Sequence, residues 1–355
     1  MNVRFLAAAL CLLPATVSAD AARGRDLFFR EWIAVGGSDA PRPFNERSCN
    51  ACHLDAGPAR VTFTGQYAVS RGIVVRLADS AGAPDPHYGI QLQNRAPAGQ
   101  AGEGHLAIEP GEGPLRWRAV FDGPEPAAST RVGLRQATTL AGRGAIDAIP
   151  DAAIIAGEDP DDRDGDGISG RARRLGTDDA RRIGRIGRFG WKAATASLAE
   201  QSDSAMREDV GRHDSGPGEI EDLAAFAGSL PIGREDLDPD GLALFQATGC
   251  AACHVPSPEG GDARRGIFSD LLLHDMGPAL DDGVGEPGVE PAEWRTAPLI
   301  ALKPSPGRRY LHDARAPDLD AAIRAHGGEA SRAADNYAAL DAAGRAALIG
   351  FLESL

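Results

Sequence analysis

Two short segments of the chain carry apolar residues at helical spacing, and each lies just before a pair of cysteines. In residues 22–32, Phe28 and Trp32 are four positions apart. Residues 241–248 have a similar pattern, and Gly249 follows them. Apolar side chains three or four positions apart share one face of a helix, and glycine commonly ends one. The pattern therefore predicts a short amphipathic helix before each pair.

The middle of the chain alternates between several patterns. Residues 62–75 contain short runs of β-branched residues, which favour strands. Residues 80–130 are dominated by glycine, proline and charged side chains, a composition typical of loops. The segments 145–157 and 219–230 have helical spacing. We therefore expect helices separated by long loops and a few short strands.

The last part of the chain follows a predicted linker. Residues 230–240 include two prolines and interrupt the helical pattern before them. In residues 341–355 the apolar positions fall on one face of a helix that closes the chain. A leading helix, a cysteine pair and a closing helix thus outline one structural unit.

The N-terminal residues have the pattern of a secretory signal peptide. Arg4 precedes an apolar run at residues 5–13, and the small residues 17–19 precede Asp20. A membrane anchor needs about 20 apolar residues, roughly twice the length of this run. No later segment is apolar over a sufficient length. We predict a signal peptide at residues 1–19, a mature protein in the periplasm, and no membrane span.

Composition and charge narrow the possible partners. The 44 glycines and 25 prolines among 355 residues indicate many turns. The formal net charge is −14. Because phosphate binding relies on clustered lysine and arginine, this charge argues against nucleic acid as a partner.

The cysteines carry the most specific chemical information. Cys11 leaves with the signal peptide. The mature chain keeps four cysteines in two Cys-x-x-Cys-His motifs, namely Cys49, Cys52 and His53, and Cys250, Cys253 and His254. This spacing is the attachment signature of c-type haem, in which both thiols bind one macrocycle and the histidine binds its iron. The sequence predicts two covalently bound haems.

Three other interpretations of the cysteines are weaker. A disulfide within each pair is compatible with an oxidising compartment, but it leaves His53 and His254 unexplained. A zinc site built from all four thiols needs pairs about 15 to 20 residues apart, and these pairs are much farther apart. A thioredoxin-like redox motif does not account for two copies that are each followed by histidine.

The two motifs define the expected fold. We predict a mainly α protein made of two cytochrome c-like haem domains, with long loops and a few short strands. The N-terminal haem domain, with large insertions, is assigned to residues 20–230. The C-terminal cytochrome c-like domain is assigned to residues 231–355.

Each iron either has a sixth ligand or leaves that position open. The candidates in the mature chain are His87, His105, His213, His274, His312, His326, Met206 and Met276. His326 has the best local pattern, because Leu319, Ile323 and His326 fall on one face of a helix that Asp318 or Asp320 caps. A histidine on such a face is more often a core residue, although a domain that encloses a haem favours the ligand role.

Several longer segments carry a family resemblance. They are residues 268–278, 295–299, 310–313 and 326–330, with further matches at 88–93, 159–171 and 188–193. This set resembles the di-haem thiol oxidoreductases. That family is similar, more distantly, to bacterial di-haem cytochrome c peroxidases and to the di-haem enzyme that matures methylamine dehydrogenase.

The resemblance implies a ligand for the second haem. In the related peroxidases, the position one short helix after the Tyr-x-His-Asp element supplies the distal ligand, and here that position is His326. Met276 is the alternative ligand, or it is a core residue. Two histidines imply a lower potential than a histidine and a methionine.

The resemblance also implies an iron at the first haem that is open, or opens on reduction, to peroxide. Gln91, Gln93 and Asp147 are candidates for its distal pocket. Asp147 departs from the family pattern, in which glutamate is expected, so it is either a proton-transfer residue or an exposed carboxylate at a helix end. Trp191 is either an electron relay between the haems, as in related enzymes, or a packed core residue.

An acidic loop provides a candidate calcium site. Asp162, Asp164 and Asp166 occupy positions 1, 3 and 5, and Gly167 occupies position 6, as in a calcium-binding loop. Arg173 stands where the loop expects glutamate. Asp159 or Asp161 can supply the missing carboxylate, and the alternative is an acidic turn with no metal.

Together these features predict a periplasmic di-haem c-type oxidoreductase, peroxidase-like, that passes electrons between two haems. The expected partners are a small redox protein, as electron donor or acceptor, and a small oxidant such as peroxide. One alternative is an electron-transfer cytochrome with two six-coordinate irons and no substrate chemistry. A haem-based sensor is a weaker one.

Overall fold

The computed structural model describes most of the chain beyond the signal-peptide region. The described residues are 19–32, 43–64, 67–97, 99–111, 113–176, 183–233, 237–256 and 266–355. The predicted signal peptide therefore lies outside the described residues except for Ala19. Among the helices of the described part, none has the length and apolar character needed to cross a membrane.

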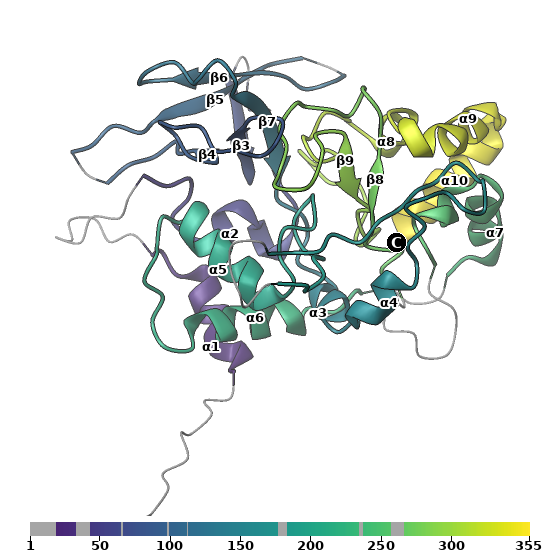
Figure 1. Cartoon of the computed structure of the whole chain (residues 1–355), viewed down its shortest axis with the longest axis horizontal. Helices are drawn as coiled ribbons and strands as arrows, with labels where there is room; N and C mark the ends of the chain where they lie inside the picture. Colours follow the sequence, from purple (N-terminus) through teal and green to yellow (C-terminus); the bar gives the residue numbers. More distant parts are fainter. Residues whose placement is uncertain are drawn as a thin grey trace, which may run out of the picture.

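The N-terminal cysteine pair lies in a group of helices, the lower left part of Figure 1. This group comprises α1 (Ala21–Phe29), α2 (Cys49–Cys52), the 3-10 helix η1 (Leu54–Ala56), α5 (Leu198–Glu208) and α6 (Glu219–Ser229). Asp20 caps α1 by accepting hydrogen bonds from two backbone N–H groups of its first turn. The helix packs against α6 so closely that a Cβ on Gly24 would lie 1.8 Å from the carbonyl oxygen of Asp222. Glycine at this position therefore allows the two helices to meet.

Small antiparallel sheets lie above these helices (Figure 1). In one, β3 (Ile73–Ala78) is the central strand between β4 (Gln91–Leu92) and β7 (Arg131–Gln136). Two hairpins complete this region, β1 (Arg60–Thr64) with β2 (Tyr67–Arg71), and β5 (Gly104–Glu109) with β6 (Arg116–Phe121). Their buried face is formed mainly by aliphatic side chains, including Val75, Leu77 and Leu134.

The C-terminal cysteine pair lies in a second group of helices, at the right of Figure 1. This group comprises α7 (Pro239–Ala247), η2 (Cys250–Ala252), α8 (Leu319–Arg324), η3 (Gly328–Ala330), α9 (Ser331–Ala339) and α10 (Ala342–Ser354). Their shared core contains Phe245, Phe268, Tyr337 and Phe351. The residues of this core all come from residues 237–355.

A third core joins the two groups of helices. It combines residues near α3 (Arg143–Asp147) and α4 (Asp151–Ile155), such as Ile146 and Ile154, with Leu271, Leu272 and Ile300. The two-stranded sheet of β8 (Leu273–Asp275) and β9 (Glu293–Arg295) lies beside this core and bridges back to Arg171. The two groups thus share a core, and the domain boundary placed between residues 230 and 231 stays a prediction.

The expectation of a mainly α protein is wrong. The structure is 30% helical and 18% strand. Residues 104–109 and 116–121, expected to be loop, form the paired strands β5 and β6, and residues 131–136 pair with β3. Glycine, proline and charged residues crowd this region because the strands are short and partly exposed, which weakens the alternation that identifies a strand. The helix expected at 145–157 is two short helices, because Pro150 interrupts it.

Candidate functional site

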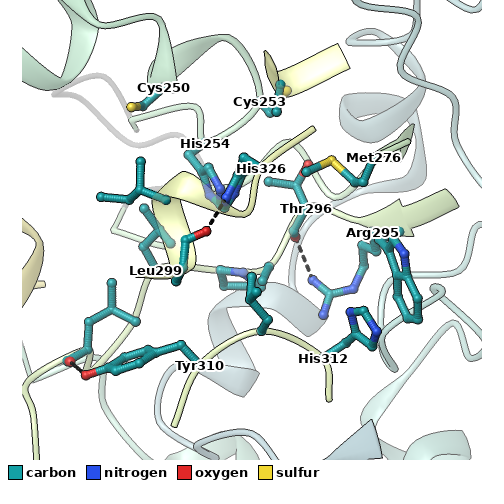
Figure 2. A pocket seen from close by; sticks show the side chains of 18 of the residues that line it. Cys250, Cys253, His254, Met276, Arg295, Thr296, Leu299, Tyr310, His312 and His326 are labelled. Atoms are coloured by element: carbon teal, nitrogen blue, oxygen red, sulfur yellow. Dashed lines mark hydrogen bonds between the residues drawn. The ribbon is translucent and has the colours of Figure 1, made fainter. Parts of the chain in front are cut away.

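A cavity of about 300 Å³ lies between the C-terminal helices and the β8–β9 sheet. Cys250, Cys253, His254 and His326 line one part of it, as Figure 2 shows. The opposite wall includes Gln136, Thr138, Thr139 and Trp191 from the N-terminal half of the chain. The cavity therefore extends from the second Cys-x-x-Cys-His motif toward the first half of the molecule.

The end of α7 presents the second cysteine pair to this cavity. Gly249 has a φ of 89°, a left-handed conformation that favours glycine, and η2 begins at the next residue. The Thr248 hydroxyl donates to the Leu244 carbonyl at 2.9 Å and lies 3.3 Å from the Cys250 sulfur. The cysteines are free thiols. The turn that ends the helix thus positions Cys250.

Two histidines face each other beside these cysteines. The ring centroids of His254 and His326 are 6.5 Å apart, and the ring planes are inclined by 55°. Nδ1 of His254 donates to the Phe268 carbonyl at 3.1 Å, and Nδ1 of His326 donates to the Ala322 carbonyl at 2.8 Å. Because a carbonyl only accepts, the proton of each neutral ring is on Nδ1. Each Nε2 is left with a lone pair that can bind a metal.

Burial keeps both rings neutral. Desolvation, followed by the repulsion of His326, lowers the pKa of His254 to about 4. Desolvation also lowers the pKa of His326. Neutral imidazole is the form that binds a metal, so both rings are ready to act as ligands at neutral pH.

These residues fit a haem. Two bonds of about 2 Å between a metal ion and imidazole nitrogens, added to the radii of two rings, give a separation close to the observed one. Free thiols and a largely apolar cavity lie next to the two rings. The donor set therefore agrees with a macrocycle bound at the cysteines whose iron lies between His254 and His326.

The first motif has similar local geometry. Ser48 caps α2 by accepting from the Ala51 amide, and His53 follows the helix directly. Nδ1 of His53 donates to the Thr138 carbonyl at 2.8 Å, which leaves Nε2 available as a ligand. Burial lowers the pKa of His53 to about 4. His53 thus has the same tautomer and charge as His254.

The thiols of the first motif are unlike those of redox-active dithiols. Desolvation and the nearby charge of Asp209 raise the pKa of Cys49 to about 12 and raise that of Cys52 well above its usual value. A redox-active Cys-x-x-Cys motif needs a lowered thiol pKa, because the thiolate is the nucleophile. The environment therefore disfavours the thioredoxin-like interpretation.

The surroundings of His53 in the first motif differ from those of His254 in the second. Within the part of the chain that the structure describes, no second imidazole contacts His53. His87, His105 and His213 are exposed at the surface. Met206 is buried in the cluster against which Cys49 packs. The first motif thus has no counterpart of the His254–His326 pair among the described residues.

The structure separates the three candidates for the first distal pocket. The side-chain amides of Gln91 and Gln93 both donate to the carbonyl of Glu208, at 3.0 and 2.9 Å, at the C-terminal end of α5. Asp147 is exposed and accepts from the amide of Leu198, at the N-terminal end of the same helix. The two ends are roughly 15 Å apart at 1.5 Å per residue.

The two glutamines and Asp147 therefore do not meet in one pocket. Gln91 also donates to Asp209, at 2.8 Å, the carboxylate that raises the pKa of both thiols of the first motif. The glutamines thus lie close to the first motif.

Trp191 lies on the cavity wall. Its indole N–H donates to the Gln136 carbonyl at 2.8 Å, two residues before the carbonyl that holds His53. The ring meets His312 edge-on at 6.3 Å. His312 in turn stacks on Trp294 at 3.6 Å with an angle of 13°. Trp191 therefore lies between the cavity and the segment that contacts the first motif.

Met276, the alternative ligand, also lines the cavity (Figure 2). It directly follows β8, and its backbone lies against Gly327 and Gly328. His326, not Met276, is the residue whose ring faces His254.

His274 is one of the candidate sixth ligands in the sequence, and the structure shows an ion-paired cluster around it. His274 is 3% exposed and lies between Asp270, at 3.0 Å, and Glu329, at 2.7 Å. Burial lowers the pKa of His274, but its hydrogen bonds with Asp270, Cys253 and Glu329 outweigh this effect and raise the pKa to about 12. Only the tertiary structure brings these residues together, since Glu329 is distant in sequence.

The acidic loop forms a compact cluster. One carboxylate oxygen from each of Asp162, Asp164 and Asp166 lies within 4.8 Å of the other two. Two residues after the loop, the amide and hydroxyl of Ser169 donate to Glu329, at 3.0 and 2.8 Å. The loop is thus connected to η3 and, through Glu329, to His274.

A family model described as "Di-haem oxidoreductase, putative peroxidase" matches residues 127–219 and 235–355. The two segments together make up more than half of the chain. The chain belongs to this di-haem oxidoreductase family. Membership supports two haems, and it agrees with the two Cys-x-x-Cys-His motifs.

Individual proteins show only weak similarity to this di-haem oxidoreductase. Among solved structures, it is similar to a hydrazine synthase of Kuenenia stuttgartiensis pressurised with xenon, with 14% sequence identity and a TM-score of 0.40. The match covers 100% of this chain and 98% of that chain. A similarity at this level carries no argument about activity. No curated protein matches the sequence.

Proposed function

We propose that this di-haem oxidoreductase is an exported, peroxidase-like enzyme that binds both haems covalently. One haem is attached to Cys49 and Cys52 and the other to Cys250 and Cys253. The observation that supports this proposal most strongly is an asymmetry. His254 faces a second imidazole at 6.5 Å, whereas no second imidazole contacts His53 among the described residues.

The second site is suited to electron transfer. The rings of His254 and His326 face each other, so together they would hold the iron of a bound haem and would leave no free position for a substrate. Both rings are held by carbonyl groups of the backbone, which keeps their orientation constant when the charge of the site changes. We infer that electrons from a small redox protein enter here and that Trp191 relays them toward the first site.

The first site is suited to the reaction with a small oxidant. A haem iron supplies electrons, and where an axial position is open it is also the place at which peroxide is reduced. Reduction of peroxide to two water molecules consumes two electrons and two protons. His53 would hold the iron of a haem bound there, and Gln91 and Gln93 fix the end of α5 near the first motif. We assign Asp147 a structural role at the other end of this helix.

We place the mature protein in the periplasm. The apolar run at residues 5–13 and the small residues before Asp20 support export. Covalent attachment through Cys-x-x-Cys-His motifs also agrees with an oxidising compartment.

We further propose a calcium ion at the acidic loop. The three clustered carboxylates of Asp162, Asp164 and Asp166 are hard oxygen ligands of the kind that calcium prefers. Asp159 is close enough to contribute, because it accepts from the backbone amides of Arg163 and Asp164 within the loop.

Absorption and EPR spectra of the purified holoprotein test the main proposal. We expect one low-spin ferric signal from the second site and a second iron whose spectrum changes on adding peroxide, in the oxidised or the half-reduced protein. Mass spectrometry should show the polypeptide plus two haems. Two low-spin irons that do not respond to peroxide in either state would contradict the peroxidase proposal and favour an electron-transfer cytochrome.

A further inference from the structure

The lining of the cavity is strongly positive although the protein as a whole is acidic. The formal net charge of the chain is −14. The charged side chains of the lining other than histidine are Arg143, Arg295, Arg308, Arg309, Arg332 and Glu329. The single carboxylate is already hydrogen-bonded to His274, whose pKa is raised. The described walls of the cavity therefore carry an excess of positive charge.

Two of these arginines are buried and form no ion pair with a described residue, although the charge of Asp270 acts on Arg295 from beyond 4.0 Å. Arg143 is 7% exposed and Arg295 is 4% exposed. In the described part of the molecule, neither guanidinium has a carboxylate within 4.0 Å. The buried Arg135 and Arg173, by contrast, form ion pairs with Asp282 and Glu286.

The hydrogen bonds of the two arginines leave donors free. Arg295 donates through Nε to the Gly190 carbonyl at 2.8 Å and through Nη1 to the Thr296 carbonyl at 2.9 Å. Arg143 donates through Nε and Nη2 to the Thr139 carbonyl, at 2.8 and 2.6 Å. Nη2 of Arg295 and Nη1 of Arg143 have no partner among the described residues and are not enclosed by protein. Both nitrogens therefore border the cavity.

The two guanidinium groups remain charged. Burial, and for Arg295 the repulsion of Arg143, lowers the pKa of Arg295 to about 9, and burial lowers that of Arg143 to about 10. Both values are above neutral pH. A nearby anion stabilises a buried positive charge, so these two groups are suited to hold one.

The position of Arg295 indicates which anion this is. In Figure 2, Cys250 and Cys253 lie on one side of the His254–His326 pair, and Arg295 lies on the other. In haem, the vinyl groups that bind the cysteines and the two propionate carboxylates occupy opposite edges of the macrocycle. Residues on the Arg295 side therefore face the carboxylate edge.

We propose that Arg143 and Arg295 bind the propionate carboxylates of the haem attached to Cys250 and Cys253. This inference rests on the proposed function, because it requires that haem. Guanidinium groups form strong charge-assisted hydrogen bonds with carboxylates. Arg143 also donates to the Thr138 hydroxyl at 3.0 Å, and the Thr138 carbonyl accepts from His53. The same segment thus connects the carboxylate edge of the second haem to the first haem site.

The midpoint potential of the second haem tests this proposal. Replacing Arg295 by Gln removes a positive charge beside the macrocycle. Loss of this charge stabilises the ferric state relative to the ferrous state. We expect R295Q to shift the equilibrium between ferric and ferrous haem at least tenfold toward the ferric form. This shift corresponds to a fall in midpoint potential of about 59 mV for one electron. R143Q should lower the potential in the same direction, and R295K, which keeps the charge, should restore most of the wild-type value.

Arg171→Gln is the matched control. Arg171 forms the β-bridge with Leu273 of β8 and an ion pair with Glu293, two residues before Arg295 on β9, but it does not line the cavity. R171Q should leave the potential unchanged. The proposal fails if R295Q and R143Q hold a full complement of haem and keep the wild-type potential, or if R171Q shifts it equally. Absence of covalent haem from the wild type would instead contradict the proposed function itself.

The alternative ligand of Arg143 and Arg295 is a free carboxylate that diffuses into the cavity. Titration of the wild type with acetate and with benzoate, followed by absorption spectra, distinguishes the two sources. If haem propionates occupy the arginines, we expect no saturable change. A saturable change that R295Q abolishes would assign the two arginines to a free anion and overturn the proposal.

Discussion

At the scale of single residues, the orientation of the His326 ring determines whether its Nε2 is available as a second imidazole ligand opposite His254. The helix cap at Asp318 starts α8, whose last turn supplies the Ala322 carbonyl that accepts from His326 Nδ1. The other ring nitrogen is thereby left for a metal. Trp191, His312 and Trp294 form an aromatic group beside this site.

Replacing His326 by Ala should remove the low-spin ferric signal of the second haem. One axial ligand is lost and no other described imidazole faces His254, so the iron becomes high-spin or binds water. EPR at low temperature and the absorption spectrum measure this change. M276L is the control, because Met276 also lines the cavity and its replacement should leave the signal intact. Loss of the signal in M276L with retention in H326A would make Met276 the ligand.

At the scale of elements, helix α5 is in contact with all three residues that were predicted for the first distal pocket. Its N-terminal end receives Asp147, and its C-terminal end receives Gln91 and Gln93. Carboxylates stabilise the N-terminal end of a helix because they accept from free N–H groups and oppose its dipole. Asp147 thus supports the helix from the end away from the glutamines.

Replacing Asp147 by Ala should lower the free energy of unfolding by about 1 kcal/mol, the usual effect of losing such a carboxylate. Denaturant unfolding of the holoprotein measures this loss. Asp147→Asn is the matched variant, because its side-chain oxygen still accepts from Leu198, and it should retain part of the stability. The reaction with peroxide should be unchanged in both. A large loss of peroxide turnover in D147N with unchanged stability would restore the proton-transfer role.

At the scale of the whole molecule, Glu329 connects parts that are far apart in the sequence. It accepts from Ser169, beside the acidic loop, and from His274, next to Cys253. Glu329 itself lies three residues after His326. The segment beside the acidic loop and the residues next to Cys253 therefore share one set of hydrogen bonds.

Removal of calcium should lower the thermal stability of the whole protein. A ligand that binds the folded state alone stabilises it by about 2.7 kcal/mol at a concentration 100 times its dissociation constant. Chelation followed by thermal unfolding should lower the Tm, and added calcium should restore it. D164N should weaken this response, whereas D203N, on the surface of α5, should not. An identical Tm with and without the chelator would contradict the calcium proposal.

Most of the helices that flank the cysteines could be predicted from the sequence. Phe28 and Phe245 are buried on the expected faces of α1 and α7, and α10 closes the chain as expected. These elements are local, because spacing and caps within about ten residues determine them. Strands β5, β6 and β7 were missed because their burial depends on partners elsewhere in the chain, such as the pairing of Leu134 on β7 with Val75 on β3.

The amino-acid sequence alone determined the two Cys-x-x-Cys-His motifs, since each is a contiguous signal whose residues are at most four positions apart. It also singled out His326. Only the tertiary structure decided that His326 faces His254, that Asp147 lies far from Gln91, and that Arg143 and Arg295 lie buried without a carboxylate partner beside one cavity. Each of these relations joins segments separated by dozens of residues or more, and their distances depend on how the cores pack.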